Sequence, residues 1–319
     1  MRTTFLVGLL SLGLVQAQEA PRVVVVGIDG PTQQALGPFG GSYRGHHDDV
    51  IRQLNAAGAR GIGFDMSFGP NPAQAEATET LARTAAESRA PVVIAVFSSE
   101  GVPEPNAPSF ERLGVRQAAI EAQAELVLEE GALGDANAAL RLGRDPEVEV
   151  RTGAWAILEQ VGPYKSLVGE LAEATGVARE LPTEDLPTGV RQDPTTRLLS
   201  LETTRALRPQ LGDPESVTTV SYVDVLEGRV DPELLRGAIV LVGMTDGQQD
   251  VLENPDPDGA PTLDRVPGVY LHAFALERVI REARPSGRRA VQPRVSSCRC
   301  GGTSGSAGRG LIGSLNDGQ

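Results

Sequence analysis

Residues 23–29, with the sequence VVVVGID, place the strongest constraint on how this chain folds. Four consecutive valines predict a β-strand that is buried on both faces, because a strand with one face in water would alternate apolar and polar residues. Strands of this kind belong to parallel sheets that helices cover on both sides. The run ends at Asp29, so a carboxylate lies at the C-terminal end of the strand, where open α/β sheets bind ligands.

Two later segments repeat this pattern. Residues 62–65 (IGFD) precede Met66, Ser67 and Phe68, and residues 239–243 (IVLVG) precede Met244, Thr245 and Asp246. Parallel strands that carry polar residues after their C-terminal ends share one edge of a sheet. We therefore expect the three strands to lie side by side, with their polar ends along one rim.

The remaining segments with a clear pattern alternate between strand and helix. This alternation predicts an α/β fold, a mostly parallel, doubly wound sheet flanked by helices. Gly58 is expected to end one helix in the left-handed conformation, and the Gly- and Pro-rich residues 31–43 predict a loop. The expected helices are 46–57, 73–88 and 269–281, with short helical turns at 222–228 and 232–235 and a further strand at 91–97.

The middle of the chain, residues 131–194, has the least regular pattern. We expect an irregular insertion that covers one edge of the sheet, in which residues 148–158 fit a strand or a helix equally well. Residues 248–265 are dense in Asp, Pro and Gly and predict a long loop at the rim. Helical spacing is also found in residues 112–130, 165–175 and 198–207.

Both ends of the chain differ in character from its centre. Arg2, the apolar residues 5–15 and the small residues that follow predict a signal peptide or an N-terminal membrane anchor over residues 1–20. The domain itself is expected over residues 21–284, outside the cytoplasm. Residues 285–319 are rich in Gly, Ser and Arg without an apolar pattern, and they predict a disordered tail.

Composition excludes several classes of function. The net charge of −13 argues against a nucleic-acid partner and against attraction to an anionic membrane surface. The only lysine, Lys165, does not follow a glycine-rich turn, which excludes a phosphate-binding loop of the common type. The two cysteines, Cys298 and Cys300, lack the two further ligands of a zinc site. No cofactor and no metal are predicted.

The candidate ligand-binding residues lie after the predicted strands. Asp29 and Asp65 are suited to bind a cation or to accept hydrogen bonds from a ligand's hydroxyl or amine group. The alternative is that each carboxylate caps backbone N–H groups of the following loop. Thr245, Asp246 and Asp250 follow the last strand on the same edge, and their alternative is an ordinary polar loop.

Two further candidates lie on predicted helices. His272 is flanked by apolar residues, so it is either a core histidine held by one hydrogen bond or a ligand-contacting or pH-sensing group at the rim. Arg44 is suited to clamp an anionic ligand, or it forms a surface salt bridge. His46 and His47 adjoin two aspartates, but neighbouring helical residues point in different directions, so no single metal site is expected there.

Four blocks of this sequence resemble CHASE domains of the second type. They are VVVVGIDG at residues 23–30, Arg44 and His47 leading into LNAAGARGIGFDMSF at 54–68, SYVDVLEGRVDPELLRGAIVLVGMTDG at 221–247, and PGVYLHAFALERVI at 267–280. The resemblance spans residues 21–284. It implies an extracytoplasmic sensor of the kind attached to bacterial adenylate cyclases, histidine kinases and serine/threonine kinases.

The sequence departs from this family pattern in two places. The turn before Arg44, usually rich in aromatic residues and proline, is PFGGSY here. Several membrane helices and a cytoplasmic effector usually follow the sensor, whereas no apolar stretch of the ~20 residues needed to span a membrane follows residue 283 here. We interpret the tail as an out-of-frame or truncated reading of a longer gene, with a genuine short secreted relative as the alternative.

The resemblance predicts a sensor fragment that binds an unknown small-molecule or environmental signal and is not itself an enzyme. The membrane is an expected partner if the N-terminal segment stays uncleaved, and a homodimer is possible. One alternative is an exported α/β enzyme, such as a metal-assisted hydrolase that uses the same carboxylates with His272. Another is a free-standing periplasmic binding or dimerisation module.

Overall fold

The computed structural model describes residues 20–99, 102–128, 132–142, 144, 150–246, 251–253 and 265–283. Three predicted parts of the chain lie outside the described residues. They are residues 1–19 of the leader, most of the loop 248–265 including Asp250, and the tail 285–319.

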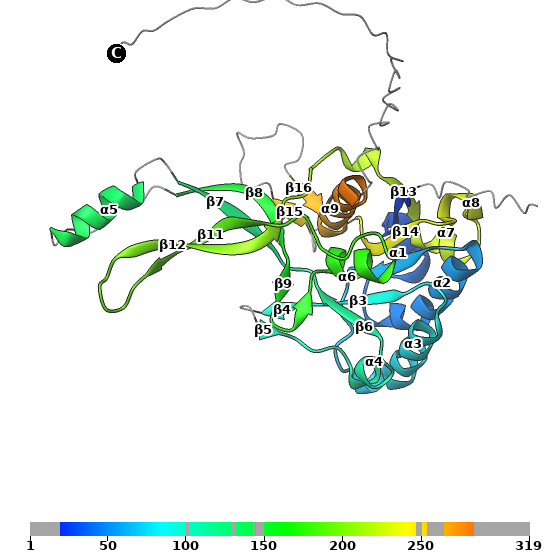
Figure 1. Cartoon of the computed structure of the whole chain (residues 1–319). Coiled ribbons are helices and arrows are strands. Elements are labelled where there is room, and N and C mark those ends of the chain that lie inside the picture. The colour runs from blue at the N-terminus through cyan, green and yellow to red at the C-terminus, as the bar shows by residue number, and fades with distance from the viewer. Residues whose placement is uncertain are drawn as a thin grey trace, which may run out of the picture. The chain divides into compact units, whose positions relative to one another are not determined.

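A six-stranded sheet forms the centre of the domain (Figure 1). The order of its strands is β13-β1-β14-β2-β3-β6. Every pair of neighbouring strands is parallel. This arrangement confirms the predicted α/β class and places β14 between β1 and β2. The strands are β1 (Val23–Ile28), β2 (Gly61–Phe64), β3 (Val92–Val96), β6 (Arg116–Ala119), β13 (Thr218–Ser221) and β14 (Ile239–Met244).

The four valines of β1 alternate between two separate hydrophobic cores. Val24 and Val26 pack in the core that α2, α3 and α7 cover, whereas Val23 and Val25 pack in the core that α6 and α9 cover. A strand buried between two helical layers has no polar face, which accounts for the uninterrupted valine run. The helices are α2 (Arg44–Ala57), α3 (Ala75–Glu87), α6 (Leu167–Ala174), α7 (Tyr222–Leu226) and α9 (Gly268–Ala283).

The connections after neighbouring strands lead to opposite faces of the sheet. The chain leaves β1 and β2 towards the layer of α2 and α3, and it leaves β14 towards α9 in the other layer. Because β14 lies between β1 and β2, the chain diverges at their carboxyl ends. In open α/β sheets, ligands bind outside the carboxyl ends of the strands at such a switch point.

Helices and strands with the clearest patterns were predicted correctly. The structure confirms β3, α2, α3, α6, α7, α9 and the turn α8 (Pro232–Leu235) within a few residues of the predicted bounds. Gly58 ends α2 with φ 83° and ψ 34°, the left-handed conformation expected of it.

The prediction of a loop over residues 31–43 was wrong for its first half, because α1 (Gly30–Leu36) extends to Leu36. The side chain of Asp29 accepts a hydrogen bond from the backbone N–H of Thr32 and so caps this helix. Pro31 lies in the first turn, where its missing N–H has no helical partner to lose. This segment has the residue composition of a loop, but its first part forms a short helix that begins with a strong N-terminal signal.

The middle of the chain is more regular than predicted. It contains a second, four-stranded antiparallel sheet with the order β11-β12-β8-β7. The helices predicted at 112–130 and 198–207 were wrong: the first range holds β6 and β7, and the second is β12. These elements are β7 (Ala122–Leu128), β8 (Val150–Leu158), β11 (Glu184–Gln192), β12 (Leu199–Leu207) and the helix α5 (Ala132–Arg141).

Pairing between distant strands explains these two errors. Residues of β6 complete the edge of the parallel sheet by pairing with β3. β12 pairs along its length with β11, and the hydroxyl groups of Thr188 and Thr204 lie 2.9 Å apart across the two strands. Its β-branched threonines favour a strand, and partners supplied by tertiary structure override a helical spacing of apolar residues.

Shorter elements complete the described structure. They are α4 (Pro108–Arg112), the pair β4 (Ser98–Ser99) and β5 (Val102–Pro103), the pair β9 (Gln160–Val161) and β10 (Tyr164–Lys165), the pair β15 (Val251–Glu253) and β16 (Arg265–Pro267), and the 3₁₀ turns Gly41–Tyr43, Pro72–Gln74 and Pro214–Ser216.

Candidate functional site

The carboxyl ends of β1, β14 and β2 bring three of the predicted site residues to one edge of the sheet. Asp29, Thr245 and Asp65 each follow one of these adjacent strands. The backbone N–H of Asp65 donates to the carbonyl of Val242 at 2.8 Å, and that of Thr245 donates to the carbonyl of Ile28 at 3.3 Å. These bonds continue the pairing of the strands beyond their ends and fix the positions of both backbones.

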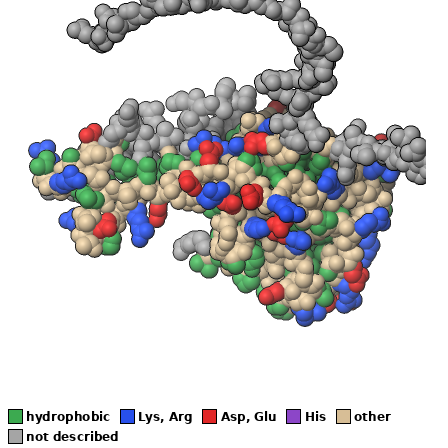
Figure 2. Space-filling view, viewed as in Figure 1, with side chains coloured by type: hydrophobic (Ala, Val, Ile, Leu, Met, Phe, Trp, Pro, Cys, Tyr) green, Lys and Arg blue, Asp and Glu red, His purple; other side chains and the backbone are tan. Residues whose placement is uncertain are grey.

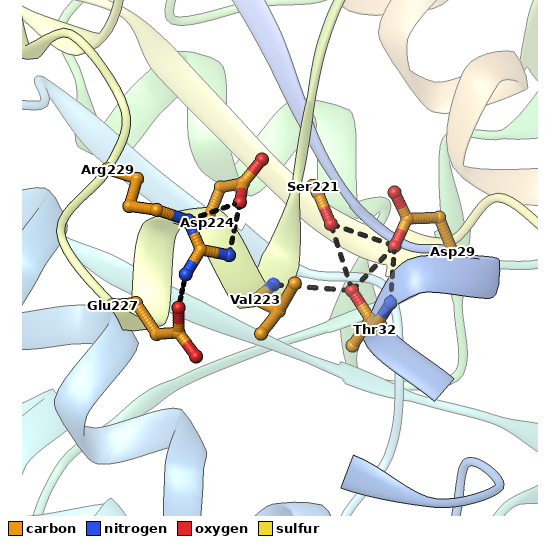
Figure 3. A network of polar contacts seen from close by, with 7 residues as sticks. All are labelled: Asp29, Thr32, Ser221, Val223, Asp224, Glu227 and Arg229. Atoms are coloured by element: carbon orange, nitrogen blue, oxygen red, sulfur yellow. Dashed lines mark hydrogen bonds and ion pairs between the residues drawn. The ribbon is translucent and has the colours of Figure 1, made fainter. Parts of the chain in front are cut away.

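Asp29 lies in a compact network of polar groups (Figure 3). Its Oδ1 accepts hydrogen bonds from the Thr32 N–H at 2.9 Å, the Thr32 hydroxyl at 2.6 Å and the Ser221 hydroxyl at 2.8 Å. The Thr32 hydroxyl also accepts from the backbone N–H of Val223 at 3.2 Å. One carboxylate oxygen therefore ties the start of α1 to the end of β13 and the start of α7.

The second carboxylate oxygen of Asp29 points away from this network (Figure 3). The side chain is half-buried. Capping of α1, the alternative considered from the sequence, occupies only Oδ1. A carboxylate has room for several donors, so Oδ2 can accept a hydrogen bond from a ligand while Oδ1 holds the helix.

Thr245 and Asp246 follow β14 beside Asp29. Thr245 is half-buried and Asp246 is exposed. A Cβ built on Gly30 would lie 2.9 Å from Oδ2 of Asp246, which places this carboxylate against the start of α1. The amide of Gln33 donates to the backbone carbonyl of Asp246 at 3.4 Å. No ion pair between described residues neutralises Asp29 or Asp246, so this edge presents mainly acceptor oxygens.

Asp65 and His272 form a buried pair between the sheet and α9. Nε2 of His272 lies 3.6 Å from Oδ1 of Asp65, and each side chain is 3 % exposed. Within the described part of the chain, Oδ2 of Asp65 has no hydrogen-bond partner. Burial raises the pKa of Asp65 to about 7, because a carboxylate charge is poorly stabilised away from water.

Two glycines allow the start of α9 and the end of β14 to approach the sheet closely. A Cβ on Gly243 would lie 2.8 Å from the Cβ of Val269 and 3.2 Å from the Cβ of Asp65. A Cβ on Gly27 would lie 2.3 Å from the Thr245 hydroxyl oxygen. Such distances are far shorter than normal carbon contacts. The absence of side chains at these two positions therefore makes room for both Val269 and Thr245.

Arg44 lies on α2, and its contacts are with α3 and with the loop after β2. Its Nη1 donates to the Thr78 hydroxyl at 2.9 Å, and its Nη2 donates to the Gly69 carbonyl at 2.8 Å. The guanidinium carbon lies 5.7 Å from the centre of the Phe68 ring, within the range of a cation–π contact. Partial burial lowers the pKa of Arg44. These bonds join α2 to α3 and to the loop after β2.

Sequence reasoning missed a buried cluster around His47. Its ring contacts those of Phe64, Phe68 and Tyr222, and the Tyr222 hydroxyl lies 2.8 Å from Nδ1 of His47. Burial, with smaller contributions from His46 and Arg44, lowers the pKa of His47 to about 3. Tyr43 lies four residues before His47 and contacts it too; this helical spacing was a signal that both face one core.

Thr32 and Ser221 were also missed as partners of Asp29. Thr32 follows Asp29 by three residues, the spacing at which an N-cap side chain reaches a helical N–H. That signal was available in the sequence, but the Gly- and Pro-rich composition of the segment outweighed it. The contact with Ser221, which is 192 residues away, depends on β13 pairing with β1 and had no local signal.

A metal centre and a membrane span are both absent from the described residues. These residues contain no group of three or more His, Cys, Asp and Glu residues placed to hold a metal ion. Nor does any helix within them have the length and apolar character needed to cross a bilayer. Figure 2 shows acidic and basic side chains interspersed over the visible face.

Comparison with protein families decides the relationship that the sequence blocks indicated. The model of the CHASE2 domain matches residues 6–297, which is most of the chain. The chain belongs to the CHASE2 domain family. CHASE2 domains are extracellular sensory domains and not catalytic ones. Searches of curated proteins and of solved structures found no match.

Within this CHASE2 domain, the family-like blocks converge on the edge described above. Residues 23–30 supply β1 and Asp29, residues 54–68 supply β2 and Asp65, and residues 221–247 supply Ser221, β14 and Thr245. The block at 267–280 supplies α9 with His272. The sequence blocks that carry the resemblance are thus the segments that meet at the switch point of the sheet.

Proposed function

We propose that this CHASE2 domain is the extracytoplasmic sensor of a transmembrane receptor and that it binds a small cationic ligand at the carboxyl edge of β1 and β14. The free orientation of Asp29 Oδ2 is the observation that carries this proposal, because it leaves a half-buried acceptor beside the switch point (Figure 3). Asp246 adds a second carboxylate, and Thr245 adds a hydroxyl group.

The chemistry of these groups favours an amine over an anion. Two carboxylates without a described ion pair attract positive charge, and their oxygens accept the N–H bonds that an ammonium group donates. A carboxylate or phosphate ligand would be repelled. A neutral polyol could use the same acceptors, but it would lack the charge contribution.

A ligand at this edge would act on α9 through β14, which packs against that helix. Thr245 and Asp246 directly follow that strand, and the next described helix is α9. A ligand changes the balance of two arrangements only if it binds one of them more tightly. In this proposal the tighter arrangement is the one in which Asp246 after β14 and Asp29 after β1 both direct their carboxylates towards the ligand.

Thermal unfolding of the whole chain in the presence of chosen probes tests this site. The probes are putrescine and spermidine as amines, choline as a cation without N–H donors, glucose as a neutral polyol and acetate as an anion. We expect spermidine and putrescine to raise the unfolding temperature, at saturation by a few degrees, because roughly 3 kcal/mol of stabilisation accompanies a concentration of about 100 times Kd. Acetate should have no effect.

Matched variants locate the binding site. Asp29→Asn keeps an oxygen that caps α1 but removes the charge, and Asp246→Asn removes the charge of an exposed residue. We expect each variant to weaken the amine effect at least about tenfold in concentration, the size of one lost charge-assisted hydrogen bond. Asp185→Asn on the exposed face of β11 is the control. An amine effect that survives in both rim variants would refute the site.

A further inference from the structure

Asp65 and His272 form a buried contact between the end of β2 and α9, and this contact does not involve a ligand. Asp65 is fixed at the end of β2 through its backbone bond to Val242. His272 lies in the first half of α9, one turn after Val269, whose Cβ abuts Gly243. The two side chains meet 3.6 Å apart, out of contact with water. They therefore join the sheet and the helix through titratable groups.

The charge of such a pair depends on how many protons it holds. With one proton it is neutral overall, either as a carboxylic acid beside an imidazole or as a carboxylate beside an imidazolium. Loss of that proton leaves a single negative charge beneath α9. An isolated charge in a site shielded from water is costly unless the surrounding structure moves to admit water or another partner.

We propose that Asp65 and His272 act as a one-proton latch, which holds the start of α9 on the sheet while the pair keeps its shared proton and loosens it when that proton is lost. The latch makes the domain responsive to extracytoplasmic pH. It goes beyond the ligand site proposed above, since the ligand-binding carboxylates of Asp29 and Asp246 take no part in it.

The pH at which the proton is lost follows from burial. Burial raises the pKa of Asp65 to about 7, from 3.8. The folded domain thus binds this proton more tightly than the unfolded chain does. The stabilisation of the folded domain by this bound proton is complete in acid and falls as the pH rises from 3.8 towards 7. The latch is consequently expected to open from neutral to mildly alkaline pH.

The titratable groups on and beside the elements packed against α9 have contacts of their own. After β1, Asp29 accepts hydrogen bonds from Thr32 and Ser221, and after β14 the carboxylate of Asp246 lies against Gly30. On α6, Glu170 forms an ion pair with Arg116 at 2.5 Å.

On α9 itself, the Tyr270 hydroxyl lies 3.2 Å from the Thr219 hydroxyl, and Glu277 is a partly buried acid whose pKa burial raises. Glu277 is therefore the group that competes most directly with the latch as a source of pH dependence in this helix.

Hydrogen exchange of the α9 amides in the full chain, without added ligand, tests the latch. After correction for the intrinsic pH dependence of exchange, we expect protection of residues 269–273 to fall at least about tenfold from mildly acidic to mildly alkaline buffer, the change that one pKa unit represents. In parallel, the infrared band of a buried protonated carboxyl group should disappear over the same pH range.

Three variants assign the effect to the pair. Asp65→Asn should abolish both the pH-dependent protection and the infrared band, while Glu277→Gln should keep both. His272→Gln should move the transition to lower pH, because the pair loses one of the two groups that can carry the shared proton.

The wild-type chain alone can overturn the proposal. Protection of α9 that does not change with pH in the wild type would do so, whether or not the variants fold. So would a transition that persists in Asp65→Asn or disappears in Glu277→Gln.

Discussion

Replacing Gly243 with alanine is expected to destabilise the domain by roughly 1–3 kcal/mol, the usual cost of inserting a methyl group into a packed interior. The added Cβ would lie 2.8 Å from two carbon atoms of Val269 and 3.2 Å from the Cβ of Asp65. These atoms are close to the backbones of α9 and of the chain after β2, so the conflict cannot be relieved by rotating the end of a flexible side chain. The first turn of α9 must move.

Denaturant-induced unfolding of the whole chain measures this effect. The matched control is Gly45→Ala on the exposed side of α2, where an added Cβ has no neighbour within 4 Å. That control is expected to be neutral or slightly stabilising, because alanine favours a helix over glycine. Equal stability of Gly243→Ala and Gly45→Ala would show that α9 is not packed against β14 as described.

The second large effect is expected at His47 in acid. Burial, aided by His46 and Arg44, lowers its pKa from 6.5 to about 3. The folded domain therefore resists protonation of a group that the unfolded chain protonates readily. The stability that this histidine contributes is complete above pH 6.5 and is lost as the pH falls towards 3. The full loss is roughly 5 kcal/mol, at 1.36 kcal/mol for each pKa unit.

The variant His47→Gln, which removes the ionisable ring, should flatten this acid loss. Because Asp65 contributes a change of the opposite sign between pH 3.8 and 7, wild type alone would show little net slope from the two groups. The difference in unfolding free energy between wild type and variant cancels the Asp65 contribution and isolates His47. His46→Gln is the control and should change the profile much less than His47→Gln, because His46 makes only a smaller contribution than burial to the lowered pKa of His47. A pH-independent difference between wild type and His47→Gln would contradict this account.

The main sheet could be predicted from the sequence because its strands are buried on both faces. The valine run of β1 and the apolar run of β14 have few alternatives to a strand that is covered on both faces, and polar residues after parallel strands must share an edge. The proximity of Asp29, Asp65 and Thr245 followed from that argument. The order of the strands, which places β14 between β1 and β2, is what makes them direct neighbours.

The errors arose where local pattern and tertiary partners disagreed. Residues 198–207 carry apolar residues at helical spacing, yet a partner strand supplies the hydrogen bonds that keep β12 extended. Residues 31–43 have the composition of a loop, yet Asp29 and Pro31 start a helix within them. The hydrogen bonds of β12 were visible only in the folded chain, whereas the capping signal of Asp29 and Thr32 was present in the sequence but was outweighed by the Gly- and Pro-rich composition.

The pairing of Asp65 with His272 is the part of the site that could not be predicted from the sequence. The sequence predicted that Asp65 lies at the rim and that His272 borders the core. Their contact also requires the start of α9 to pack closely against the end of β14, which the absence of a side chain at Gly243 permits. The pKa of Asp65 then follows from its burial, a property of the assembled layers that neither residue's neighbours in sequence reveal.

A map of the spermidine-binding surface tests most directly the central claim that this CHASE2 domain binds its signal at the carboxyl edge of the sheet. Backbone amide resonances of the isotope-labelled chain would be followed during a spermidine titration. The account predicts that the largest shifts cluster at residues 27–33, Ser221 and residues 243–246. Shifts that cluster instead at the opposite edge, around the hollow of about 360 Å³ lined by Arg22, Ser216 and Arg281, would contradict it, as would a titration without shifts.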